Sequence, residues 1–281
     1  MSAISVSGLR KSYGGVEALR GIDFEVAAGE VFGLLGPNGA GKTTTVEILE
    51  GYRKRDAGDV SVLGFDPGKA ERAFRERIGV VLQESELWSV LTVREIHRMF
   101  AGYYQHPRDV DEVIALVGLS EKRDAKAKTL SGGQKRRLDL GMALVGDPEL
   151  VFLDEPTTGF DPAARRNAWE LVRSLRGLGK TVLLTTHYLD EAQQLADRVA
   201  VIVAGEIVRL GKPSELIAGT RAQIRYRAGG EEIVVETNEP TRTLHELTAR
   251  ALADGIELEA LEVRRATLED IYLELVAEES K

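Results

Sequence analysis

The sequence contains no cysteine, so disulfides, thiol catalysis and cysteine-ligated metal sites are all excluded. Its four histidines are scattered along the chain, which argues against a zinc site. The longest clean apolar run covers residues 199–204, far short of the about 18 residues that cross a bilayer. The first residues have neither the charged nor the apolar region of a signal peptide. We therefore expect a soluble intracellular protein.

An excess of basic residues is also missing. Lys and Arg number 37 against 45 Asp and Glu, which gives a net charge of −8 over 281 residues. Such a balance argues against an extended nucleic-acid-binding surface, and no nucleic-acid partner is expected. The length fits one large domain or two unequal ones, and a hydrophobic content of 43% is enough to bury a sizeable core.

Apolar patterns divide the chain into regions. The first 28 residues alternate between apolar and polar, as half-buried strands do. Short apolar runs at residues 31–35, 150–153 and 181–186 alternate with helical stretches and predict an α/β domain with a mainly parallel sheet. Residues from about 84 to 146 predict an inserted helical subdomain. After residue 219, a hairpin, a helix, a strand and a second helix predict a small α+β appendage, so the expected domains are 1–219 and 220–281.

A glycine-rich segment follows the first of these buried runs. Residues 36–43 read GPNGAGKT and fit the pattern G-x-x-x-x-G-K-[ST], with a predicted strand before it and a helix after it. Glycines let successive N–H groups point at phosphate oxygens, and the new helix adds its positive dipole end. Lys42 would reach the β- and γ-phosphates and Thr43 would offer its hydroxyl to Mg²⁺. The alternative is an ordinary glycine turn, which this context disfavours.

Polar residues follow the two later apolar runs. Asp154 and Glu155 come directly after the second run, where Asp154 can hold Mg²⁺ and Glu155 can polarise an attacking water. His187 follows the third run and is a candidate sensor of the γ-phosphate. A solvated acidic pair and a packed or surface histidine are the structural alternatives.

The segment LSGGQ at residues 130–134 precedes another helix. Ser131 and Gln134 have the S-x-x-Q spacing of a capping box, so one interpretation is a well-capped helix. The other is a second anion site built from glycine N–H groups at a helix N-terminus. The residues alone do not separate the two.

Together, the glycine loop, Gln83, LSGGQ, Asp154 with Glu155, and His187 resemble the nucleotide-binding domain of ATP-binding cassette (ABC) proteins over residues 1 to about 215. The resemblance implies an α/β P-loop NTPase cassette with an N-terminal antiparallel β part. It assigns adenine stacking to Tyr13, Mg²⁺ sensing and catalysis to Gln83, and communication across a dimer to Asp161. Phe160 stands where an aliphatic residue is usual. The resemblance assigns nucleotide contacts to Tyr13, Gly36, Pro37, Asn38, Gly39, Ala40, Gly41, Lys42, Thr43, Thr44, Ser131, Gly132, Gly133, Gln134 and Asp161.

The resemblance further implies that two chains pack head to tail around ATP, with the LSGGQ segment of one closing over nucleotide on the other. It implies ATP hydrolysis that powers a separate membrane permease, and a cytoplasmic location at the inner face of the membrane. LSGGQKRRLDL and the closing ATLEDIY are similar to exporter ATPases of the bacterial daunorubicin–doxorubicin type. Non-transport ABC ATPases of translation or DNA repair are the alternative, and a small-molecule P-loop kinase is a more remote one. Trp88 is the candidate contact to the permease, and the tail is a candidate dimer contact.

Overall fold

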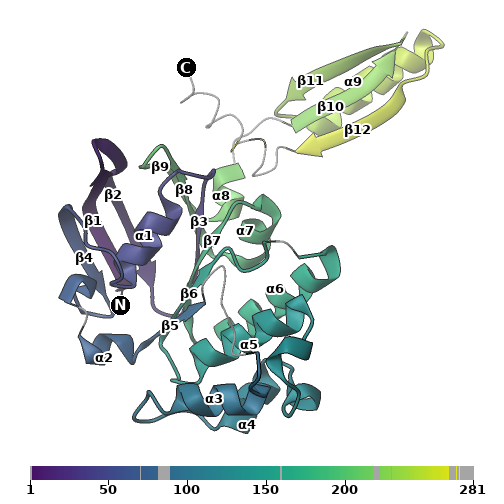
Figure 1. Ribbon diagram of the computed structural model, residues 1–281. Helices are drawn as coiled ribbons and strands as arrows, with labels where there is room; N and C mark the ends of the chain where they lie inside the picture. The colour runs from purple at the N-terminus through teal and green to yellow at the C-terminus, as the bar shows by residue number, and fades with distance from the viewer. Residues whose placement is uncertain are drawn as a thin grey trace. The chain divides into compact units, whose positions relative to one another are not determined.

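The computed structural model describes residues 2–69, 71–81, 89–158, 160–217, 222–228 and 230–265, together with residues 270 and 272. The chain forms two compact units, Met1–Lys212 and Pro213–Lys281 (Figure 1). The boundary expected at residue 219 falls among residues 218–221, which lie outside the described part of the chain.

A six-stranded sheet in the order β5-β6-β7-β3-β8-β9 is the centre of the first unit. The pairs from β5 to β8 are parallel, and β9 joins the edge antiparallel to β8. Every residue of β3 and β7 is buried, including the three threonines of β7. The strands are β5 (Ile78–Val81), β6 (Leu150–Asp154), β7 (Thr181–Thr186), β3 (Val31–Leu35), β8 (Arg198–Val203) and β9 (Glu206–Gly211).

Side chains of the inner strands alternate between two hydrophobic cores, one on each face of the sheet. Phe152 belongs to one core, and its neighbours Val151 and Leu153 belong to the other. The first core is shared with the N-terminal β part, and the second with the helical subdomain. A strand that is buried on both faces has mostly apolar residues, which is why these strands do not alternate between apolar and charged positions.

The N-terminal part is an antiparallel sheet in the order β2-β1-β4. In β2, Ile22, Phe24 and Val26 are buried while the residues between them are exposed. Helix α1 (Lys42–Leu49) contributes Val46 and Ile48 to the core shared by both sheets. The α/β fold with a mainly parallel core and an antiparallel N-terminal part is thus confirmed. The strands are β1 (Ser2–Tyr13), β2 (Val16–Ala27) and β4 (Ala57–Val62), and a short helix α2 (Arg72–Arg75) precedes β5.

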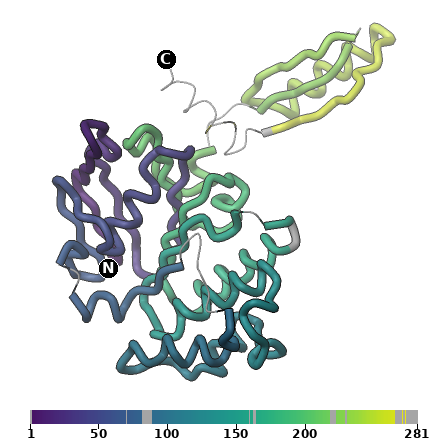
Figure 2. Tube along the Cα trace, viewed as in Figure 1, coloured from purple at the N-terminus to yellow at the C-terminus, as the bar shows by residue number. Residues whose placement is uncertain are grey.

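Helices lie between β5 and β6 in the described part of the chain, and the tube in Figure 2 follows them towards the sheet. Helix α3 begins with a capping box between Thr92 and Glu95, and α5 with one between Ser131 and Gln134. No helix of the described residues is both long and apolar enough to cross a membrane. The helices of this unit after α2 are α3 (Val93–Ala101), α4 (Val110–Leu116), α5 (Gly132–Leu144), α6 (Pro162–Gly177) and α7 (Leu189–Leu195).

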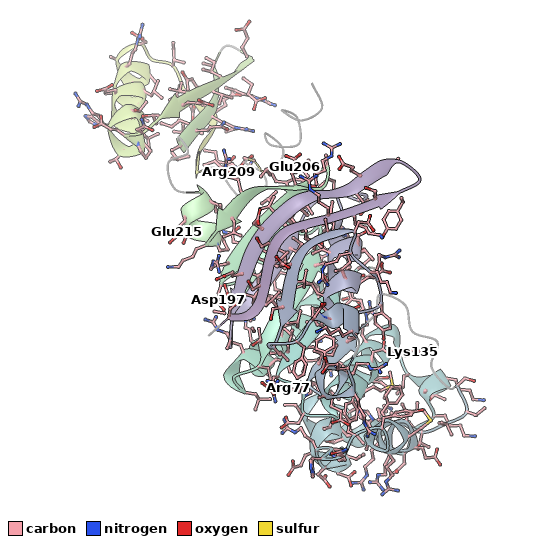
Figure 3. The ribbon with its side chains drawn as sticks, turned by 90° about the vertical axis from the view of Figure 1, so that its left-hand side faces the viewer. Arg77, Lys135, Asp197, Glu206, Arg209 and Glu215 are labelled. Atoms are coloured by element: carbon pink, nitrogen blue, oxygen red, sulfur yellow. The ribbon has the colours of Figure 1, made fainter. Side chains whose placement is uncertain are left out.

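Polar contacts fix the amino ends of the central strands. Asp197 accepts a hydrogen bond from the amide of Val31 at 3.0 Å and pairs with Arg176, which holds the start of β8 beside β3 (Figure 3). Arg77 donates two hydrogen bonds, of 2.6 and 2.8 Å, to the carboxylate of Glu149 and so joins the starts of β5 and β6. The opposite, carboxyl ends of the strands carry the candidate site.

The second unit contains a three-stranded antiparallel sheet in the order β11-β10-β12, with one helix packed on β10. The hairpin predicted around residues 229 and 230 is formed by β10 and β11. Ile224, at the middle of the central strand, is completely buried. This unit comprises α8 (Pro213–Ile217), β10 (Ala222–Ala228), β11 (Glu231–Thr237), α9 (Pro240–Ala253) and β12 (Glu259–Arg265).

Candidate functional site

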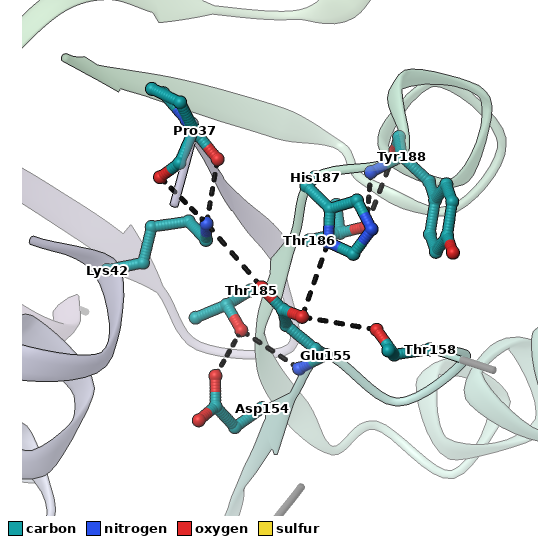
Figure 4. Close-up of polar contacts among 10 residues, drawn as sticks. Pro37, Lys42, Asp154, Glu155, Thr158, Thr185, Thr186, His187 and Tyr188 are labelled. Atoms are coloured by element: carbon teal, nitrogen blue, oxygen red, sulfur yellow. Dashed lines mark hydrogen bonds and ion pairs between the residues drawn. The ribbon is translucent and has the colours of Figure 1, made fainter. Parts of the chain in front are cut away.

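The carboxyl ends of three neighbouring parallel strands meet at one edge of the central sheet. Leu35 at the end of β3 is opposite Thr186 at the end of β7, and Asp154 at the end of β6 is opposite Thr185. The glycine loop, the acidic pair and His187 follow these strands directly. Segments about 120 and 150 positions apart in sequence therefore come together here, as Figure 4 shows.

Two glycines of the loop could not carry a side chain. A Cβ on Gly36 would lie 2.3 Å from the carbonyl oxygen of Ile202, and one on Gly41 would lie 2.7 Å from Leu19. Gly41 also has a φ of 109°, which only glycine adopts easily, and it stands at the N-cap of α1. The loop therefore packs closely against β8 and β2. Pro37, Ala40 and Thr44 are at least partly buried, and Asn38, Gly39 and Thr43 are exposed.

Lys42 is the first residue of α1 and turns back into the loop. Its side chain is only 4% exposed, and Nζ donates hydrogen bonds to the carbonyl oxygens of Gly36 at 2.7 Å and Pro37 at 3.2 Å. Burial lowers the pKa of Lys42, although the nearby carboxylate of Glu155 opposes that shift. The ammonium group is thus held at the mouth of the loop, where it can meet a phosphate oxygen.

Asp154 is fixed by the neighbouring strand. Its Oδ1 accepts a hydrogen bond from the hydroxyl of Thr185 at 2.5 Å, and the same hydroxyl oxygen accepts one from the amide of Glu155 at 2.9 Å. Burial raises the pKa of Asp154, because few groups replace its lost hydration. A bound cation would offset that cost, so the position suits a cation ligand.

Glu155 stands at the centre of the polar contacts. Its Oε1 lies 3.5 Å from Lys42 Nζ, while Oε2 accepts a hydrogen bond from Thr158 at 3.1 Å and lies 3.3 Å from His187 Nδ1. Burial acts to raise the pKa of Glu155, but the charges of Lys42 and His187 and the hydroxyl of Thr158 bring it below its usual value. The side chain is 13% exposed, so an ionised carboxylate is available to a water molecule.

The backbone at Glu155 is also unusual, with a φ of 45° in the left-handed region. A residue other than glycine in this conformation is strained, and the surrounding contacts must hold it there. His187 packs its ring against Tyr188, with the ring centroids 4.1 Å apart, and is one-third exposed. The Tyr188 amide in turn donates to the hydroxyl of Thr186 at 2.9 Å.

Tyr13 is the last residue of β1. Its ring is 39% exposed, with the guanidinium of Arg53 at 5.1 Å and Lys11 Nζ at 5.4 Å from its centroid. Arg53 is held in turn by Glu47 of α1. An exposed aromatic ring with cations beside it can stack on a purine base.

Ser131–Gln134 lie away from this cluster. The capping box is formed: the Gln134 amide donates to Ser131 Oγ at 3.3 Å, and the Ser131 amide donates to Gln134 Oε1 at 3.0 Å. No atom would approach a Cβ on Gly132 within 4 Å, and Gly133 would meet only Ala164. Their open faces leave room for another molecule.

A cavity of about 630 Å³ lies between α5 and α6. It is lined by Asp161 and by residues 131–134, which we call the signature segment. Asp161 accepts a hydrogen bond from the amide of Ala164 at 2.8 Å, which secures the start of α6. Among the described residues, Lys42 and Glu155 are not part of the lining, whereas Thr158 is. Within one chain, the glycine loop and the signature segment are therefore separate features.

Some predicted residues cannot be placed, and some structural partners were not predicted. Gln83 and Trp88 lie outside the described residues. Thr158 and Thr185 contact the acidic pair directly, yet neither was among the predicted site residues. Thr158 could have been found from its place three positions after Glu155, but Thr185 depends on the register of β6 against β7.

The chain is similar to known proteins over nearly its whole length. The family model "ABC transporter" matches residues 19–158. The Nod factor export ATP-binding protein I of Rhizobium sp. (strain N33) is 40% identical, over 99% of this chain and 98% of that protein. The chain belongs to the ABC transporter family. Within this family, the daunorubicin resistance ATP-binding protein DrrA3 of Streptomyces coeruleorubidus is 39% identical over 100% of this chain and 98% of its own length.

A solved relative adds a nucleotide state. An ATP-binding cassette in a dimeric, post-hydrolysis state bound to ADP and Pi superposes with a TM-score of 0.66 at 25% identity, covering 74% of this chain and 98% of that one. The protein is accordingly an ABC ATPase that binds ATP, as the motifs predicted. Dimerisation is therefore known for one solved relative of this chain.

Proposed function

We propose that this ABC ATPase hydrolyses ATP to power export through a separate membrane permease, and that it acts at the cytoplasmic face of the membrane. The observation that carries the proposal is the convergence of Lys42, Asp154, Glu155 and His187 at one sheet edge. Full-length similarity to two exporter ATPases favours export over translation or DNA repair. By their names these relatives serve Nod factor export and daunorubicin resistance, so we infer a lipid-like, drug or other amphiphilic substrate.

The chemistry requires a water molecule to attack the γ-phosphorus while the bond to the bridging oxygen breaks. In the proposed mechanism Lys42 holds the β- and γ-phosphate oxygens, Glu155 takes the proton of the water and His187 contacts the γ-phosphate. Thr158 and His187 orient the Glu155 carboxylate from one side. Tyr13 stacks on the adenine, and the loop amides from Gly39 to Thr44 surround the phosphates.

Mg²⁺ supplies charge neutralisation on the phosphate oxygens when it is bound. Asp154 and the exposed hydroxyl of Thr43 offer the oxygen donors that this ion prefers, and Gln83 is a third proposed ligand. Among the described residues, no group of three or more acidic, histidine or cysteine side chains could hold a metal alone. An ion shared between these donors and the phosphates of ATP fits that arrangement.

We further propose that two chains share each nucleotide head to tail. Gly132 and Gly133 have open space beside them at a helix start, where N–H groups attract phosphate, and the cavity that they line does not include Lys42 of their own chain. Asp161 stands on the same cavity and would communicate between the two sites.

Mixing two inactive variants tests this arrangement. Lys42→Ala removes the phosphate cation, and Ser131→Arg blocks the signature segment without touching the glycine loop. A mixed dimer retains one complete site, so the mixture should associate on addition of ATP more than either variant alone, as measured by size-exclusion chromatography. A mixture that behaves as the sum of its components would rule out shared sites. Co-purification with a polytopic membrane protein encoded by a neighbouring gene tests the transport role.

A further inference from the structure

Helix α7 carries a carboxylate that the proposed reaction does not use. Glu191 is completely buried, although a buried carboxylate is costly unless it is paired. Its Oε1 accepts a hydrogen bond from the indole N–H of Trp169 on α6 at 3.1 Å, while the Glu191 amide donates to Asp190 at 2.9 Å.

Two buried threonines face the Glu191 carboxylate. Thr157 is 1% exposed and follows the acidic pair, and Thr186 is 1% exposed and ends β7. Burial raises the pKa of Glu191, and the hydroxyls of Thr186 and Thr157 and the indole of Trp169 oppose that shift. Glu191 Oε2 and Thr157 Oγ1 are each buried without a hydrogen bond of ordinary geometry to any described residue.

The residues next to these threonines are the two that contact Oε2 of Glu155. Thr158 follows Thr157 and donates to Glu155 Oε2, and His187 follows Thr186 and lies 3.3 Å from the same oxygen. In both segments, one residue faces the buried carboxylate and its successor faces the proposed catalytic base. The two segments are about 30 positions apart in sequence, so Glu191 is a shared support for both.

Further contacts join α7 to α6 around this point. Arg165 of α6 pairs with Asp190 at 3.5 Å, and its guanidinium lies 4.2 Å from the centroid of the Tyr188 ring. Asp161 secures the start of the same helix α6. The contacts of Glu191 therefore extend from the segment carrying Glu155 to the helix that begins after Asp161.

We propose that Glu191 is a positioning residue for ATP hydrolysis: it holds the backbone at residues 157 and 186 so that Thr158 and His187 orient the Glu155 carboxylate. The inference rests on the proposed roles of Glu155 and His187. It assigns Glu191 no contact with ATP, so its loss should affect turnover and leave nucleotide affinity nearly unchanged.

Two substitutions separate positioning from packing. Glu191→Gln keeps an acceptor for Trp169 and adds an N–H donor for Thr157, so kcat should stay within about threefold of wild type. Glu191→Leu has a similar volume but no polar atom, so it leaves the Trp169 indole N–H without its acceptor. Its kcat should fall about tenfold, less than the about 10²-fold expected for loss of the base itself, with KM for ATP within about twofold. Glu170→Leu, an exposed position next to Trp169, is the matched control and should behave as wild type.

A double-mutant cycle tests the route of the effect. If Glu191 acts partly through His187, Glu191→Leu should cost less in a His187→Ala background than in wild type. Full additivity, or a wild-type kcat for Glu191→Leu, would overturn the inference, as would equal losses for the Leu and Gln variants.

If Glu191→Leu does not fold, the Trp169→Phe variant tests the inference instead, because it removes only the indole donor. An unchanged kcat in a folded Trp169→Phe protein would contradict positioning by Glu191. The Glu155→Gln variant, measured in parallel, distinguishes failure of this inference from failure of the proposed function. Normal turnover in Glu155→Gln would show that Glu155 is not the catalytic base.

Discussion

Lys42 Nζ and Glu155 Oε1 lie 3.5 Å apart, so the proposed phosphate cation and the proposed base are ion-paired with each other. Both side chains are largely buried, which makes this pair stronger than a surface one. A phosphate that takes Lys42 must compete with Glu155 for it. Nucleotide binding and release of the base to act on water are thereby linked through a single contact.

Replacing Glu155 by Gln should change ATP hydrolysis and ATP affinity in opposite directions. The amide cannot take a proton, so ATP hydrolysis should fall by about 10²-fold or more, as phosphate release would measure. Lys42 loses its competing anion, so affinity for a fluorescent ATP analogue should rise by a few-fold. Glu149→Gln, which removes only a surface carboxylate paired with Arg77, serves as the control. Wild-type turnover in Glu155→Gln would contradict the assignment of the base.

Tyr13 should contribute to ATP affinity only through its contact with the adenine ring. Stacking is worth about 1–3 kcal/mol per base, so Tyr13→Ala should weaken ATP binding by about 5–150-fold. Inorganic triphosphate lacks a base, and its competition for the site should be unchanged by the substitution. Tyr52, which is 73% exposed beyond the end of α1, offers a matched control in Tyr52→Ala. An equal loss for ATP and triphosphate would show that Tyr13 acts on the loop instead.

Glu50 should make stability depend on pH. Burial, followed by the charges of Asp154 and Glu47, raises the pKa of Glu50 to about 8 from 4.5. Between these values the folded protein keeps a proton that the unfolded chain has lost, so this group lowers stability as pH rises through that window. Glu50→Gln has no such proton, and its Tm relative to wild type should be higher at pH 8 than at pH 5.

Thermal unfolding at both pH values checks this prediction. Each ~1 kcal/mol of difference should move Tm by ~2–4 °C for a protein of this size. Glu25→Gln alters an exposed carboxylate and should show no comparable trend. A Tm difference for Glu50→Gln that is the same at both pH values would mean that Glu50 does not titrate in this range.

The C-terminal unit should be dispensable for nucleotide binding. Residues Pro213–Lys281 form a compact unit of their own and include none of the predicted nucleotide contacts. A chain ending at Lys212 should therefore bind ATP within a few-fold of full length, as titration with a fluorescent analogue would measure. Loss of binding would show that this unit stabilises the cassette.

The same unit is a candidate contact between two chains. Leu252 near the end of α9 is 81% exposed and Ile256 is 49% exposed, so apolar surface is available for a partner. We expect truncation at Lys212 to reduce self-association without nucleotide, measured by sedimentation velocity. Identical monomeric sedimentation of the full-length and truncated proteins would exclude a dimer contact in this unit.

The sequence alone determined the features that depend on neighbouring residues. Residues 36–43 could be identified because phosphate binding needs glycines, a lysine and a helix start at fixed spacing. The apolar runs predicted the parallel sheet because strands buried on both faces tolerate few polar residues. The S-x-x-Q spacing predicted a capping box at Ser131, and that box is formed. Spacing could not decide whether the same segment also binds an anion.

Only the tertiary structure decided which distant side chains support the site. Thr185 reaches Asp154 because β6 and β7 pair in a register that places these residues opposite each other. Glu191 gave no sequence signal, since a glutamate in an amphipathic helix is usually solvated and its burial against Trp169 depends on how α6 packs on α7. The ion pair of Lys42 with Glu155 likewise joins residues more than 100 positions apart. Local spacing specifies which groups the chain offers, whereas the packing of strands and helices fixes their distances and hence their charge states.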